Sequence, residues 1–148
     1  SWLSRSSDFD VVEAADGEPL KPGRAYLAPD NRHMGVQAGG RIFLSDAPRE
    51  NNLRPAVSFL FRSTAESFGA RSAGVILTGM GKDGSAELMD IKKAGGVTIA
   101  QDRETSIVHG MPGEAIKMGS ADILLPSEKI ASALTSIAAG ARKAAVSQ

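Results

Sequence analysis

The sequence contains no cysteine, which excludes disulfides, thiolate metal ligands and a cysteine nucleophile. Because a chain without cysteine suits a reducing compartment, we expect a cytoplasmic protein. The chain also has no net charge, since 17 Lys and Arg residues balance 17 Asp and Glu residues. Without a global positive field, neither nucleic acid nor an anionic membrane surface is an expected partner.

Long apolar runs are absent as well, so the sequence predicts no membrane-spanning helix. Residues 1–5 lack the basic head and apolar stretch of a signal peptide, and they lack an initiator methionine. We therefore expect a piece of a longer protein. Its 148 residues, 42% of them hydrophobic, fit one domain over 1–148, with 141–148 as a frayed tail.

The chain divides into two patterns of predicted elements. Short strands are expected in the first third, over residues 9–15, 25–28, 33–37 and 41–45. Residues 38–40, Ala-Gly-Gly, tolerate positive φ and predict a hairpin, so this third is expected to be antiparallel. Helices (55–68, 85–94, 112–118, 127–137) then alternate with strands (73–78, 97–100, 123–125). Such alternation predicts a three-layer α/β fold with a mostly parallel, doubly wound sheet plus the antiparallel hairpin.

The most unusual loop follows the predicted strand 73–78, where residues 79–84 read Gly-Met-Gly-Lys-Asp-Gly. Ligand sites in open parallel sheets lie beyond the carboxyl ends of the strands, so this loop is the first place to look. Either Asp83 caps the helix that follows it, or the glycines let backbone N–H groups and Asp83 approach a ligand. Spacing alone favours the cap. A phosphate cradle would need the lysine and hydroxyl pair of a P-loop, which is absent.

Candidates for the remaining parts of a catalytic site are few. Only His33 and His109 could supply an imidazole, and we expect both to be structural. Ser58 and Ser63 fall inside a predicted helix, and Ser106 does not lie in a glycine-flanked strand-to-helix elbow. No catalytic triad can be assembled from spacing. Because histidines and carboxylates are not clustered, neither a metal nor another cofactor is expected.

Several blocks of sequence occur in an order that is typical of one family. Residues 74–84 read Gly-Val-Ile-Leu-Thr-Gly-Met-Gly-Lys-Asp-Gly, residues 98–101 Thr-Ile-Ala-Gln, and residues 110–116 Gly-Met-Pro-Gly-Glu-Ala-Ile. Further blocks lie upstream, at 13–18, 27–29, 32–34, 54–55 and 60–63. Together they strongly resemble the catalytic domain of CheB-type protein-glutamate methylesterases, over about residues 9–134.

The resemblance implies a serine carboxylic-ester hydrolase of bacterial chemotaxis, a form of two-component signalling. Such an enzyme removes methyl groups from glutamates on chemoreceptor helices and deamidates glutamines there, with a Ser-His-Asp triad and no cofactor. Asp83 matches the triad acid, and Met80 matches the residue whose backbone N–H helps to form the oxyanion hole. Gly79, Gly81 and Gly84 would support that loop. The implied partners are methylated chemoreceptor helices and a receiver domain in the parent protein.

Some family features have no match in this sequence. The family's serine follows its first strand in a glycine-rich elbow, and its histidine lies in a Gln-His-Met-Pro segment. We therefore expect the first strand, helix and second strand of the family fold to be missing, and the chain alone to be inactive. His109 stands where the family tends to carry an aromatic residue, Ser58 where it tends to carry an acid, and His33 lies in a different block from the catalytic histidine. A degenerate homologue that binds a receptor or partner without catalysis is the alternative.

Overall fold

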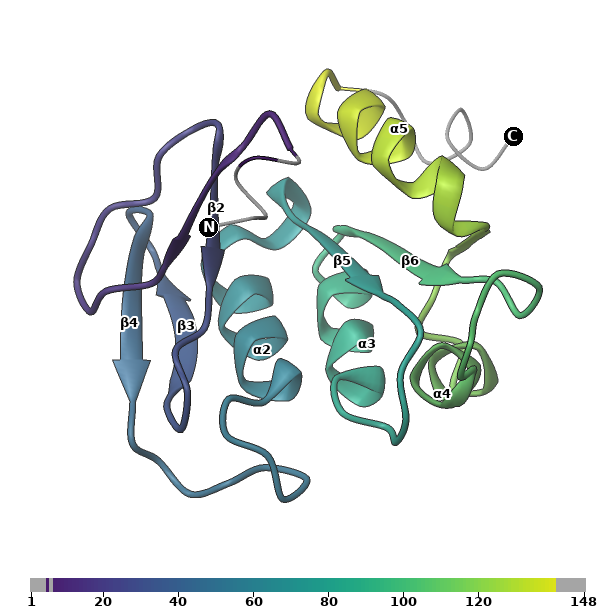
Figure 1. Ribbon diagram of the computed structural model, residues 1–148, viewed down its shortest axis with the longest axis horizontal. Coiled ribbons are helices and arrows are strands. Elements are labelled where there is room, and N and C mark those ends of the chain that lie inside the picture. Colours follow the sequence, from purple (N-terminus) through teal and green to yellow (C-terminus); the bar gives the residue numbers. More distant parts are fainter. Residues whose placement is uncertain (1–4, 6, 141–148) are drawn as a thin grey trace.

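A computed structural model describes residues 5 and 7–140; the expected frayed tail, 141–148, lies outside the described residues. The chain starts with β1 (Asp10–Glu13), β2 (Arg24–Leu27), β3 (His33–Gln37) and β4 (Arg41–Ser45) (Figure 1). β3 and β4 form the predicted antiparallel hairpin, and Gly39 and Gly40 at its turn have φ of 93° and 78°. The hairpin positions β3 against the next helix.

β1 and β2 pair in parallel in a separate sheet, so the expectation of an antiparallel first third was wrong for this pair. The reason lies in the connection between them. Instead of turning directly back, it crosses to β4, where Ile42 donates its N–H to Glu18 (2.9 Å) and accepts from Gly17 (2.9 Å). A connection of that length lets the second strand run in the same direction as the first.

Helix α2 (Val57–Phe68) lies between the hairpin and the rest of the molecule (Figure 1). On one side, Ser63 accepts the N–H of Val36 in β3 (3.1 Å). On the other side, Phe61 is buried in an apolar core with Ile76, Leu88, Ile91 and Ala115. The helix ends at Gly69, as predicted, where φ is 52°, and the short 3-10 helix η1 (Gly69–Arg71) follows.

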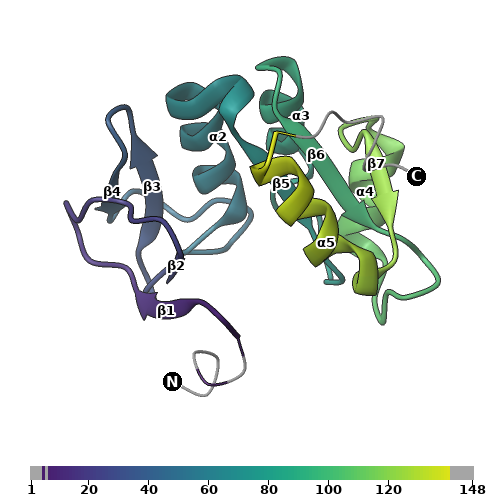
Figure 2. The same ribbon diagram turned by 90° about the horizontal axis from the view of Figure 1, so that it is seen from above.

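The remaining elements form the three-layer part of the fold. They are β5 (Ala73–Ile76), α3 (Ser85–Lys93), β6 (Val97–Gln101), α4 (Gly110–Lys117), β7 (Ile123–Leu125) and α5 (Ser127–Ala138). The strands are parallel in the order β5-β6-β7. α5 covers one face, and α3 and α4 cover the other (Figure 2). The α/β class, the parallel sheet and the hairpin are thus confirmed.

The carboxyl ends of β5 and β6 meet at one edge of this sheet, as they must in parallel strands. The loops that follow them are joined by a parallel bridge between Gly79 and His109. None of the helices in the part of the chain that the structure describes is long and apolar enough to cross a membrane.

β5 is an edge strand, because among residues 5 and 7–140 only β6 pairs with it. Val97 donates its N–H to the carbonyl of Ser72 (3.0 Å), so Ser72 faces β6. Alternate residues of a strand turn their backbone groups the same way. The N–H and C=O of Val75 therefore point to the open edge, where they can pair with another strand.

We expect the isolated chain to self-associate through this edge. Val75→Pro removes the outward N–H without removing a bond to β6, so it should reduce association. Val75→Ala loses similar packing but keeps the N–H, and it should associate like the wild type. Sedimentation velocity over a wide range of concentrations measures the effect, and a wild-type chain that stays monomeric throughout contradicts the prediction.

Candidate active site

The glycine-rich loop after β5 is held against the loop that precedes α4. Gly79 donates its N–H to the carbonyl of Val108 (2.9 Å), and Met111 donates its N–H to the carbonyl of Gly79 (2.9 Å). The hydroxyl of Thr78 bonds both the carbonyl (3.0 Å) and the N–H (2.8 Å) of Val108. The backbone at Gly79 is therefore fixed on both sides.

This fixation determines where the N–H of Met80 points. In a planar trans peptide the C=O of one residue and the N–H of the next point in opposite directions. Because the carbonyl of Gly79 faces Met111, the N–H of Met80 is directed away from α4. Within the described residues it has no hydrogen-bond partner, and Met80 as a whole is 84% exposed. This N–H is a donor available to a ligand.

Gln101, at the end of β6, also holds the start of this loop through a hydrogen bond to Thr78. Its side chain is buried; Oε1 accepts the N–H of Thr78 (2.8 Å), and Nε2 donates to the carbonyl of Thr105 (2.8 Å). Gln101 belongs to one of the family blocks, residues 98–101, but the sequence alone gave it no role. The signal for a supporting role was a carboxamide side chain at the end of a strand that is apolar apart from Thr98.

Asp83 is buried, 4% exposed, and it does not cap the helix that follows it. Its Oδ2 accepts the N–H of Val57 (2.7 Å), and its Oδ1 accepts the N–H of Ser58 (3.2 Å), the hydroxyl of Ser58 (2.8 Å) and the amide of Asn51 (3.0 Å). The carboxylate therefore caps α2. The interpretation that Asp83 caps the helix after it was therefore wrong: α3 begins after Gly84, whose φ is 81°, and has no side-chain cap.

A carboxylate that accepts the first two N–H groups of α2 stabilises the helix through these hydrogen bonds and through the helix dipole. Together they contribute about 1 kcal/mol to the free energy of unfolding. The two oxygens are not used equally. Oδ1 already accepts three donors, whereas Oδ2 accepts one. Since a carboxylate oxygen offers about two lone-pair sites, the three donors at Oδ1 compete for its sites, whereas Oδ2 keeps room for one more donor.

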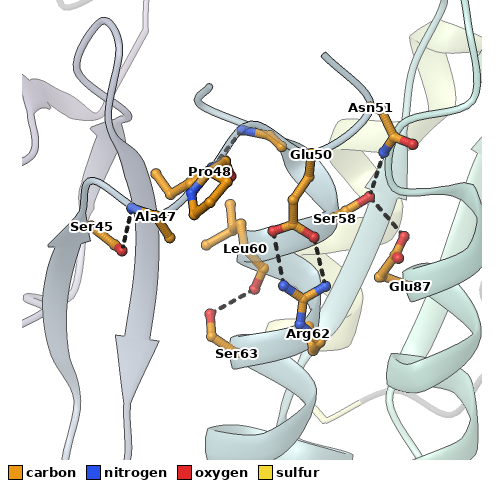
Figure 3. A network of polar contacts seen from close by, with 12 residues as sticks. Ser45, Ala47, Pro48, Glu50, Asn51, Ser58, Leu60, Arg62, Ser63 and Glu87 are labelled. Atoms are coloured by element: carbon orange, nitrogen blue, oxygen red, sulfur yellow. Dashed lines mark hydrogen bonds and ion pairs between the residues drawn. The ribbon is translucent and has the colours of Figure 1, made fainter. Parts of the chain in front are cut away.

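Asn51 is a member of the site that the sequence analysis missed. It lies 32 residues before Asp83 in the chain, in a loop where Asn51 and Asn52 have φ of 51° and 63°. Glu50 fixes this loop through two bonds from Arg62 (3.0 and 2.9 Å), shown in Figure 3. These hydrogen bonds raise the pKa of Arg62 above its ordinary value. The only signal in the sequence was a pair of asparagines in a polar loop.

The two histidines do not join this site. His33 is fully buried; its Nε2 bonds the carbonyl of Pro48 (2.9 Å), its Nδ1 accepts the N–H of Ala56 (3.2 Å), and its ring stacks on Phe59. A structural role for His33 is thus confirmed. His109 precedes α4 and lines a pocket of about 520 Å³. Neither of its ring nitrogens has a hydrogen-bond partner among the described residues.

The serines named above are also held in structural contacts. Ser58 is 1% exposed in the first turn of α2, Ser63 donates to the carbonyl of Leu60 (2.9 Å), and Ser106 donates to that of Asp102 (2.6 Å). None of these three hydroxyls bonds an imidazole. The described residues contain no group of three or more His, Asp or Glu side chains arranged to hold a metal ion.

The glycine-rich loop thus presents a buried carboxylate, with one oxygen that accepts a single donor, and a backbone N–H that has no partner among residues 5 and 7–140. The family model of the CheB methylesterase domain matches residues 1–134. The chain belongs to the CheB methylesterase family. The crystal structure of the CheB methylesterase catalytic domain of Thermotoga maritima is similar, with a TM-score of 0.88 and 43% identity, covering 92% of this chain and 74% of that one.

Two other CheB family relatives carry the name protein-glutamate methylesterase/protein-glutamine glutaminase. The protein of Syntrophus aciditrophicus is 53% identical over 93% of this chain, and that of Geobacter metallireducens is 54% identical over 93%. The chain spans 39% and 40% of the length of these relatives.

Gly84 offers a test of how α3 and the loop pack on α2. A Cβ at Gly84 would lie 2.5 Å from Cγ1 of Val57, whereas one at Gly81 would meet open space; both residues have positive φ, 81° and 94°. We expect Gly84→Ala to lower the free energy of unfolding by about 2–4 kcal/mol and Gly81→Ala by about 1 kcal/mol. Urea denaturation followed by circular dichroism measures both. Equal decreases in the free energy of unfolding for the two variants would contradict the prediction, because they would show that Val57 can move away from the added methyl group at no cost.

Proposed function

We propose that this chain is the part of a protein-glutamate methylesterase that supplies Asp83 as the acid of a Ser-His-Asp triad and Met80 N–H as an oxyanion-hole donor. The observation that carries the proposal is the unequal use of the buried carboxylate of Asp83: among the described residues, three donors bond Oδ1 and one bonds Oδ2. Gly79, Gly81 and Gly84 let the loop place both groups at one edge of the sheet. The names of the relatives support hydrolysis of a glutamate methyl ester and deamidation of glutamine as the reactions.

In this proposal the serine and histidine come from a part of the protein outside these 148 residues. The imidazole donates one N–H to Oδ2 of Asp83, and its other nitrogen takes the proton from the serine hydroxyl as the serine attacks the ester carbonyl. The N–H of Met80 stabilises the oxyanion that forms. The imidazolium returns the proton to the leaving methanol, and water then releases glutamate by the same steps.

The proposed substrate is a methylated helix of a chemoreceptor in the cytoplasm, and the parent protein is expected to carry a receiver domain. Exposed apolar side chains beside the free N–H support a helical partner. Met80 is 84% exposed, and Ile107 and Val108, on the loop paired with Gly79, are 92% and 40% exposed. Such a patch suits the apolar side of an amphipathic helix.

The triad proposal predicts that Asp83→Asn in the full-length protein lowers kcat for methanol release from methylated receptor by roughly 10³- to 10⁴-fold, because the amide cannot hold the imidazolium. Asp90→Asn makes the same chemical change at an exposed position of α3 and should have no effect. Full activity of Asp83→Asn would contradict the assignment of Asp83 as the triad acid, whereas no methanol release by the unaltered full-length protein would favour the alternative of a homologue that binds its partner without catalysis.

The isolated 148-residue chain should release no methanol, because an acid without its base and nucleophile has nothing to activate. The assay uses the same methylated receptor, with the full-length protein as the positive control. Release by the isolated chain that Asp83→Ala abolishes would contradict the proposal that serine and histidine lie elsewhere.

A further inference from the structure

The hydroxyl of Ser58 lies between two carboxylates. Its Oγ is 2.8 Å from Oδ1 of Asp83 and 2.8 Å from Oε2 of Glu87, on the facing helix α3. It also accepts the amide of Asn51 (3.1 Å) and the N–H of Gly84 (3.0 Å). Figure 3 shows Ser58 between Asn51 and Glu87. Glu87 does not bond Asp83 directly. It is connected to Asp83 through the hydroxyl of Ser58.

Counting donors and acceptors shows that these contacts compete. A hydroxyl has one proton and two lone pairs. The amide of Asn51 and the N–H of Gly84 can only donate, so they occupy both lone pairs. The single proton of Ser58 must then be shared between Asp83 and Glu87. When Glu87 accepts it, Asp83 keeps its bonds from Asn51 and the two backbone N–H groups but loses one donor.

Charged groups around Glu87 come from three elements. Asp83 precedes α3, Arg62 belongs to α2, and Glu50 lies in the preceding loop, paired with Arg62. The pKa of Arg62 is raised first by its hydrogen bonds to Glu50 and, more weakly, by the charges of Glu87 and Glu66. Arg62 is therefore a cation on which the carboxylate of Glu87 also acts, besides accepting the hydroxyl of Ser58.

The number of donors on Asp83 matters for the proposed chemistry. Each hydrogen bond donated to a carboxylate stabilises its charge and so weakens its hold on a further positive partner. We propose that Glu87 is a positioning residue that, by drawing the proton of Ser58, leaves Asp83 with a stronger hold on the catalytic imidazolium. The inference rests on the proposed role of Asp83 as triad acid. Glu87 itself touches neither substrate nor the reacting atoms.

The test uses the full-length protein and the variant Glu87→Gln, which keeps the shape but makes the side chain a weaker acceptor. We expect kcat for methanol release to fall by about 3- to 10-fold with little change in KM, since the substrate is not contacted. The acidic limb of the pH profile of kcat/KM should move to lower pH by about 0.5 unit, because a less supported imidazolium loses its proton more readily. A fold defect alone would not move this limb.

Glu66→Gln is the matched control, because Glu66 is exposed on α2 and also acts on Arg62 but has no bond to Ser58. It should leave both kcat and the pH profile unchanged. Rates are measured well below the unfolding midpoint of each variant. Equal effects of Glu66→Gln and Glu87→Gln would attribute the change to Arg62 and overturn the inference.

A double-mutant cycle locates the coupling in the hydroxyl. In a Ser58→Ala background, Glu87→Gln should have no further effect on kcat, because no proton is left to compete for. An undiminished effect in that background overturns the inference. If Glu87→Gln leaves kcat and the pH profile unchanged while Asp83→Asn abolishes activity, the inference about Glu87 fails and the triad proposal stands. If Asp83→Asn leaves kcat unchanged, both the inference and the triad proposal fail.

Discussion

The contact on which this structure depends most is the carboxylate of Asp83 at the amino end of α2. It ties the loop before α3 to the start of α2, a helix that packs on two apolar cores. One core lies among the early strands around Met34 and Ile42, and the other lies between α3, α4 and the parallel sheet. α2 contributes to both, through Leu60 and Phe61 respectively. The buried acid thus adds a polar contact, at the amino end of α2, to the apolar contacts through which this helix packs on both cores.

The same contact explains how a carboxylate can be kept buried. A carboxylate removed from water is costly unless it is hydrogen-bonded. Two backbone N–H groups at the start of α2, one hydroxyl and one amide meet that requirement at Asp83. Because these donors gather mainly on one oxygen, the other accepts a single donor among the described residues. In the proposed function, Oδ2 can therefore accept the N–H of the catalytic imidazole while the carboxylate continues to cap α2.

Much of this could be predicted from the sequence, and the failures have physical causes. The alternation of strands and helices after residue 55 identified the layers, because burial periodicity is local. The glycine-rich loop was found because residues with positive φ leave a compositional mark, as at Gly81 and Gly84. The parallel pairing of β1 with β2 was missed because it depends on a connection that crosses to β4. Asn51 and Glu87 were missed because only the packing of α2 on α3 brings them to Asp83.

The proposed double use of Asp83, as a helix cap and as a triad acid, has a consequence for how the family evolves. An acid that caps a central helix is retained by selection for folding, whether or not catalysis is also selected. A relative that had lost its serine or histidine would keep the glycine-rich loop and its aspartate, since replacing them would loosen α2. The loop motif is therefore a marker of ancestry and of fold, and the competence of any relative as a hydrolase is better judged from its nucleophile and base.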